Sequence, residues 1–95
     1  MFIVLLKFSD NKNQAKRFME VHNAWIKQGF DDGVFLLTGS LAGGAGGAVM
    51  ADNTTLDDLK NRIHDDPFVR ESVVRPEIIE ITPGKVDPRL QFLLA

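Results

Sequence analysis

The chain has 95 residues, a length that supports one hydrophobic core and leaves no room for a second domain. Hydrophobic residues make up 44% and charged residues 25%, which excludes a disordered chain, and the absence of cysteine excludes disulfides and thiolate metal sites. Acidic and basic residues are interleaved with a net charge of -2, so we expect no nucleic-acid partner. No apolar segment approaches the roughly 20 residues that span a bilayer, so we expect a cytoplasmic protein without a membrane partner.

The first half of the chain predicts a strand followed by a helix. Phe2–Phe8 is an apolar run too short for a helix, and no basic start or cleavage site marks it as a signal peptide. From residue 11 to about 28, apolar side chains recur every three or four positions, which predicts an amphipathic helix. Ser9, Asp10 or Asn11 could cap its start. Gly29 or Gly33 could supply the left-handed residue that ends it.

A hairpin is expected next. Val34–Leu41 reads as a strand, and a glycine-rich turn at 43–47 leads into a short strand at Ala48–Ala51. Glycine-rich loops can bind phosphate, but a dinucleotide loop follows a strand and opens a helix, whereas this one precedes a strand. We therefore interpret it as a turn.

The second half predicts a shorter helix and a final strand. Thr54 or Thr55, followed three residues later by an aspartate, resembles a capping box at the start of a helix. Pro67 ends that helix, and Asp66 and Pro67 fit the cap and first position of a new turn. Val73–Thr82 reads as a strand. Pro76 inside it predicts an edge strand or a bulge.

This order of elements predicts an α+β, ferredoxin-like βαββαβ fold with an antiparallel sheet and both helices on one face. Side chains alternate between the faces of a strand, and both faces of the first strand are apolar. In the second strand we expect Phe35 and Leu37 to share a face opposite Val34 and Leu36. An apolar face without helices needs a cover, and the simplest cover is a second copy, so we expect a homodimer. The apolar tail at 84–95 is expected to dock on that copy.

His22 and Asp66 are the candidate catalytic residues. His22 lies on the apolar stripe of the first helix, so its imidazole points inward, where it could act as an acid or base near neutral pH. Asp66 is its candidate partner, and Asp65 is an alternative. Both main residues also have plain structural interpretations, as a buried histidine and as a helix cap. His64 is expected to be exposed, and no recurring ligand spacing predicts a metal site.

These features together resemble the YCII-related domain family. The resemblance rests on the inward histidine, the segment Asp31–Ser40 and Asp66-Pro67-Phe68 ahead of the last strand, and it extends from residue 1 to about residue 83. Proteins of that family look like dimeric α/β barrels, in which two ferredoxin-like sheets pack face to face. The resemblance therefore implies a domain at 1–83 followed by the tail.

The resemblance also implies a function. Some relatives are cofactor-free lyases or dehydrochlorinases of small ring compounds, and the wider superfamily includes isomerases and monooxygenases. Carried over, it implies that His22 abstracts a proton while Asp66 orients it, with no cofactor and no metal. The expected substrate-binding residues are Trp25, Gly39, Ser40 and Phe68. Two alternatives are a non-catalytic dimeric module that binds a small ligand or is structural, and haem-dependent or oxygen-using chemistry.

Overall fold

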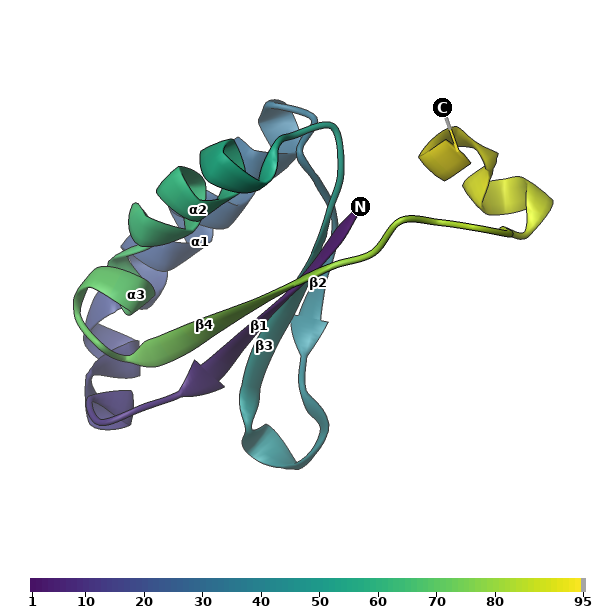
Figure 1. Cartoon of the computed structure of the whole chain (residues 1–95). Coiled ribbons are helices and arrows are strands. Elements are labelled where there is room, and N and C mark those ends of the chain that lie inside the picture. The colour runs from purple at the N-terminus through teal and green to yellow at the C-terminus, as the bar shows by residue number, and fades with distance from the viewer. Residues whose placement is uncertain (95) are drawn as a thin grey trace.

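The fold is a four-stranded antiparallel sheet with helices on one face. The computed structural model describes residues 1–94, and Ala95 of the expected tail lies outside the described residues. The strands are β1 (Phe2–Phe8), β2 (Phe35–Ser40), β3 (Gly46–Ala51) and β4 (Val74–Glu80), in the spatial order β2-β3-β1-β4. The helices α1 (Ala15–Asp31), α2 (Leu56–His64) and α3 (Pro67–Arg70) cover one side of this sheet (Figure 1). The predicted α+β, ferredoxin-like fold is confirmed, and Pro76 lies in an edge strand as expected.

The core lies between the sheet and this helical layer. Phe2, Val4 and Leu6 of β1 are buried and Phe8 is partly buried, because alternate side chains of a strand point to the same face. Those side chains meet the buried face of α2, where Leu59 and Ile63 are at most 1% exposed. The main contributors from the sheet are Phe2, Val4, Leu6, Phe35, Val49 and Val74.

Helix α1 begins later and ends later than its apolar pattern predicted. A 3₁₀ turn, η1 (Lys12–Gln14), precedes it, and no side chain caps its first turn. The prediction of a side-chain cap is therefore wrong, and the Asn11 amide instead donates to the Glu71 carbonyl at 2.8 Å. Gly33 follows the helix at φ 73°, a conformation that glycine adopts without steric cost. Gly29 lies inside the helix and does not end it.

A β-bulge in β2 changes which side chains share a face. Phe35 pairs with Ala51 and Leu37 pairs with Met50. From one pair to the next, the chain therefore moves by two residues along β2 but by only one along β3. Phe35 therefore points into the core at 2% exposed, while Leu37 points to the other face at 55% exposed. The prediction that these two side chains share a face is wrong. Strict alternation does not hold through a bulge.

The remaining predicted turns and caps are present. The Thr55 hydroxyl accepts a hydrogen bond from the Asp58 backbone N–H at 3.1 Å and caps α2, as the capping-box pattern predicted. The glycine-rich segment forms the hairpin between β2 and β3, with a short 3₁₀ turn, η2 (Ala42–Gly44), inside it. Within residues 1–94, no helix is long and apolar enough to cross a membrane.

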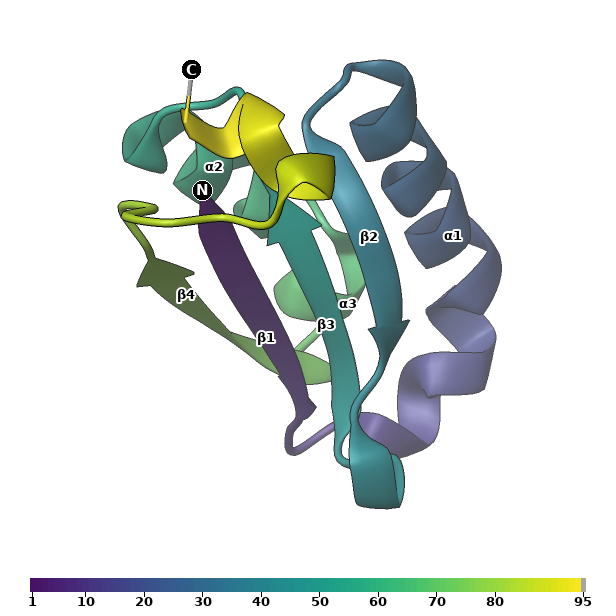
Figure 2. The same ribbon diagram turned by 90° about the vertical axis from the view of Figure 1, so that its right-hand side faces the viewer.

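We call the face of the sheet that points away from the helices the outer face. It carries apolar side chains along most of its length, and the charged side chains Lys7, Arg75 and Glu77 at the end of β1 and the start of β4. The register places Ile3, Leu5, Leu37, Met50 and Ile79 on it. Leu37 and Ile79 are more than 40% exposed. Figures 1 and 2 show the helices on one side of the sheet and the C-terminal segment on the other. The outer face agrees with the expected two-sided apolar pattern, and the homodimer inferred from it stays a prediction.

Candidate active site

His22 and Asp66 meet in the interior, although 44 residues separate them in the chain. The stripe of α1 turns the imidazole toward the sheet, and the start of α3 brings the carboxylate to it. His22 Nδ1 lies 2.7 Å from Asp66 Oδ1. The two residues are 8% and 0% exposed. Water is therefore largely excluded from the pair, which strengthens the interaction of a charge with its neighbour.

Asp66 is both the partner of His22 and the cap of α3. Its Oδ1 also accepts the Phe68 backbone N–H at 3.0 Å, and Pro67 takes the first helical position. Its Oδ2 is buried without a hydrogen-bond partner among the residues that the structure describes. An ionised carboxylate can only accept hydrogen bonds, so it places the histidine proton on Nδ1. The lone pair of Nε2 is then free for a ligand.

Two aromatic rings flank the imidazole. Phe68 stacks on it with a centroid separation of 3.8 Å and an angle of 3° between the ring planes. Trp25 lies near it at 5.8 Å and 24°. Together with the bond to Asp66, these contacts restrict both the position and the rotation of the His22 ring. Such restraint is what a group that must transfer a proton along one direction requires.

Trp25 is itself held by the C-terminal part of α2. Its indole N–H donates to the Arg62 carbonyl at 2.9 Å, and the Arg62 guanidinium pairs with Asp32 at 3.0 Å. The Gln28 side-chain amide and the Arg62 guanidinium hold the pKa of the Asp32 carboxyl below its usual range. Trp25 also contacts Phe35 edge to face at 5.1 Å. It therefore joins the core to the histidine.

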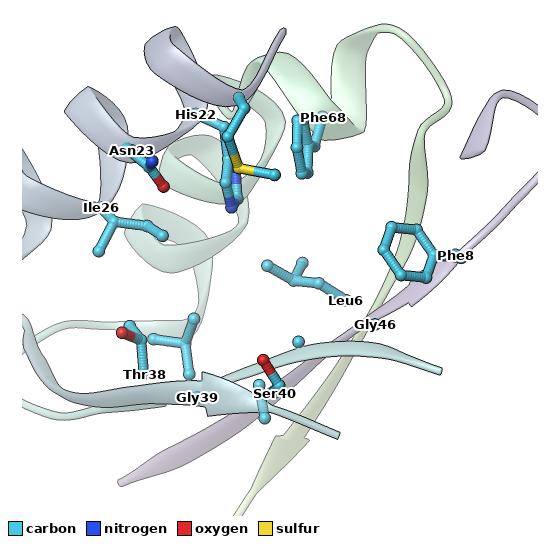
Figure 3. A pocket seen from close by; sticks show the side chains of 14 residues that line it. Leu6, Phe8, His22, Asn23, Ile26, Thr38, Gly39, Ser40, Gly46 and Phe68 are labelled. Carbon is cyan, nitrogen blue, oxygen red and sulfur yellow. The ribbon is translucent and has the colours of Figure 1, made fainter. Parts of the chain in front are cut away.

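A cavity of about 280 Å³ opens beside His22, between α1, α3 and the hairpin strands. Figure 3 shows His22 and Asn23 on the helix above it, Phe68 beside His22, and Thr38 and Ser40 on the opposite side. The remaining lining is largely apolar or glycine backbone. The lining residues are Leu6, Phe8, Met19, His22, Asn23, Ile26, Thr38, Gly39, Ser40, Gly46, Gly47, Ala48, Val49 and Phe68.

Most of the predicted site residues gather at this cavity. His22, Gly39, Ser40 and Phe68 line it, and Asp66 lies behind His22. Trp25 does not line it, because its ring lies on the core side of His22 and borders a separate surface pocket. Asp65 and His64 are exposed. Within residues 1–94, no group of three or more histidine, aspartate or glutamate side chains could hold a metal ion.

Several lining residues were not singled out from the sequence. Asn23 and Thr38 add polar side chains to the cavity, and Met19 and Phe8 add apolar ones. Met19 is three positions before His22 on the same helical stripe, so the periodicity alone could have placed it beside the histidine. The cavity positions of Asn23 and Thr38 depend on how α1 packs over β2. No lining side chain carries a formal charge other than a protonated His22.

The family-model comparison matches residues 1–83 to the YCII-related domain. The chain belongs to the YCII-related domain family. The resemblance recognised from the sequence is therefore confirmed. No curated protein sequence matches this YCII-related chain.

A solved structure shares the fold. It is 5-chloro-2-hydroxyhydroquinone dehydrochlorinase from Burkholderia phenoliruptrix, in complex with 2,5-dihydroxybenzoquinone. The TM-score is 0.71 with 11% sequence identity, and the match covers 88% of this chain and 96% of that chain. The similarity spans nearly the whole of that protein. At this identity it establishes a common fold for this YCII-related protein.

Proposed function

We propose that this protein is a cofactor-free acid–base enzyme of the isomerase or lyase type, including dehydrochlorination, that acts on a small ring compound. The observation that carries the proposal is the buried His22–Asp66 pair beside a cavity of about 280 Å³. A histidine with one nitrogen engaged by a carboxylate and the other beside a cavity is arranged for general base catalysis.

In the proposed mechanism, His22 Nε2 accepts a proton from a substrate hydroxyl, or from a carbon next to a carbonyl. The electron pair of the broken bond stays on the substrate as an enolate or phenolate. Reprotonation of this anion at another carbon gives isomerisation. Where that carbon carries chlorine, loss of a second hydroxyl proton supplies the electron pair with which chloride leaves, so that HCl is lost and a quinone remains. Ionised Asp66 stabilises the imidazolium formed in the first step. The proton then returns to the substrate or to water, so no oxidant or reductant is consumed.

The lining supports a neutral ring as the substrate. Lys and Arg are absent from the lining residues, so a carboxylate or phosphate group would enter without a counter-charge. We assign to Ser40 and the Gly39 backbone the role of positioning a substrate oxygen, and to Phe68 contact with the ring face. Trp25 is assigned an indirect part, since it packs on His22 and does not line the cavity. The dehydrochlorinase with the same fold, whose named ligand is a small quinone, supports this substrate class.

We also propose that the active form is a homodimer joined through the outer faces. The large exposed side chains there, Leu37 and Ile79, would be buried by a second sheet. The cavity lies on the helical side. This arrangement would leave its entrance free of the dimer contact.

A binding protein without chemistry is the second candidate. It is favoured by one observation, because Asp66 caps α3 and would be retained for stability without any catalytic role. On this view the cavity holds a small ligand or partner group and His22 is structural.

Turnover and binding can be measured separately on the same protein. Chloride release and ultraviolet–visible absorbance would be followed with a panel of hydroxylated and chlorinated hydroquinones, including 5-chloro-2-hydroxyhydroquinone. Binding would be followed by the fluorescence of Trp25, the only tryptophan in the chain. We expect turnover by the wild type and a loss of about 100-fold or more in kcat/KM for His22→Gln.

The chain offers a matched control, because its other histidine is exposed. His64→Gln should leave kcat/KM unchanged. A fluorescence change without turnover, equal in wild type and His22→Gln, would support the binding protein over the enzyme.

A further inference from the structure

The segment that follows the sheet carries apolar side chains away from the folded body. We call residues 82–94 the C-terminal arm. It leaves the sheet at Ile81, which is paired with Met1 through a backbone hydrogen bond of 2.9 Å. It ends in the 3₁₀ helix η3 (Pro88–Leu94), and Figures 1 and 2 show it standing off on the outer-face side. Its most exposed large apolar residues are Leu90 at 39%, Phe92 at 50% and Leu94 at 45%.

The arm is ordered by contacts among its own residues. The Asp87 carboxylate accepts the Arg89 backbone N–H at 2.9 Å and its side-chain Nε–H at 3.0 Å. The Leu90 backbone N–H donates to the Asp87 carbonyl at 2.8 Å. These local bonds start the 3₁₀ helix at Pro88 without the help of the sheet. The arm thus has a defined shape while its apolar side chains remain uncovered.

The arm and the outer face lie on the same side of the molecule. Both carry large apolar side chains that are exposed to water. If the outer faces of two subunits meet, an arm that stands off one outer face must pass alongside the other subunit. The two-fold axis would repeat the contact, so each subunit would give one arm and receive one.

We propose that the C-terminal arm of each subunit packs on the partner subunit in the homodimer, where Leu90, Phe92 and Leu94 become buried. The proposal rests on the dimer put forward above. One contact between two copies covers both uncovered surfaces of the chain, whereas folding of the arm onto its own outer face would occupy the surface that the dimer uses. All but the first two residues of the arm lie beyond the matched residues 1–83.

The absence of native cysteine allows a direct test with a spin label. Gln91 is exposed between the apolar side chains, so Gln91→Cys in the full chain accepts a nitroxide label. Nitroxide-labelled chains without ¹⁵N would be mixed with wild-type chains that contain ¹⁵N. The broadening of the amide signals of the ¹⁵N chains by the nitroxide would then be recorded. We expect broadening on the ¹⁵N chain that is strongest at the amides which the arm contacts.

The possible results test the arm contact, the dimer and the proposed catalysis separately. Sedimentation of the same sample gives the oligomeric state. A dimer without intermolecular broadening contradicts the packing of the arm on the partner subunit but supports the dimer. A monomer overturns both. Neither result bears on turnover by His22, which is measured independently.

A second experiment tests the energetic contribution of the apolar side chains. The triple variant Leu90→Ser, Phe92→Ser, Leu94→Ser should raise the dimer dissociation constant by about tenfold or more, because three side chains lose their burial on the partner. Gln91→Ser is the matched control from the same segment and should leave the constant unchanged. Equal dissociation constants for the triple variant and the control would contradict the proposal.

Discussion

At the scale of single residues, the site depends on two contacts made by one atom. Asp66 Oδ1 accepts from both His22 and the Phe68 backbone, while Oδ2 has no partner among the described residues. The same oxygen thus stabilises the start of α3 and orients the histidine. Stability and proposed chemistry can therefore be separated by substitutions that keep or remove this oxygen.

Asp66→Asn keeps an oxygen that can accept both bonds but removes the negative charge. We expect the free energy of unfolding to change by no more than about 1 kcal/mol. We expect kcat/KM to fall about 100-fold, because the imidazolium loses its charged partner. Asp66→Ala removes the cap and leaves Nδ1 unpaired, which should cost about 2 to 4 kcal/mol of stability. Urea unfolding and steady-state kinetics check both. Full activity in Asp66→Asn would mean that the charge of Asp66 has no part in catalysis and that the residue only caps α3.

At the scale of elements, the close approach of α1 to β2 holds in place the aromatic side chains that pack against His22. A Cβ atom on Gly29 would overlap the ring of Phe35, which is 2% exposed and packed in the core. Phe35 contacts Trp25, and Trp25 stacks near His22. The glycine inside α1 therefore sets the distance between a helix and a strand. Its cost in helix propensity is offset by this packing.

Gly29→Ala should destabilise the protein, although alanine is the better helix former. Overpacking in a filled core costs about 1 to 3 kcal/mol, which exceeds the gain of about 1 kcal/mol in propensity. Urea denaturation measures the net change. Gly84→Ala is the control, because nothing lies within 4 Å of the Cβ it would add. A Gly29→Ala protein as stable as wild type would mean that α1 can move away from β2 at little cost.

At the scale of the whole molecule, the cavity lies on the helical side of the sheet and the proposed dimer contact on the outer face. The helices bury one face of the sheet and enclose the cavity. None of the helices α1, α2 and α3 covers the outer face. A dimer through that face and a cavity on the other would keep the proposed chemistry and the assembly independent of each other.

Leu37→Glu should weaken the proposed dimer strongly, since it would place a charge in the contact between sheets. We expect the dissociation constant to rise by about 100-fold, measured by sedimentation. Val21→Glu provides a matched control, because Val21 on α1 is 51% exposed and Leu37 is 55% exposed. The control should dimerise like wild type. If both variants behave alike, the outer face is not the interface.

Much of the fold follows from local signals in the sequence. The order of strands and helices, the Thr55 cap and the Asp66-Pro67 start of α3 depend on residues within a few positions of one another. Backbone hydrogen bonds and caps are local interactions, so the chain determines them nearly independently of the rest. The inward direction of His22 has the same origin, in the apolar stripe of its helix.

The features that the sequence did not predict depend on how distant elements pack together. The bulge that separates Phe35 from Leu37, the use of Gly29 as a contact point and the absence of Trp25 from the cavity each depend on elements far apart in the chain. So do the distance of 2.7 Å between His22 and Asp66 and the presence of Asn23 in the lining. Periodicity gives the direction of a side chain from its own helix or strand. Only the packing of α1 and α3 against the sheet determines what that side chain meets, because such contacts are set by shape and volume.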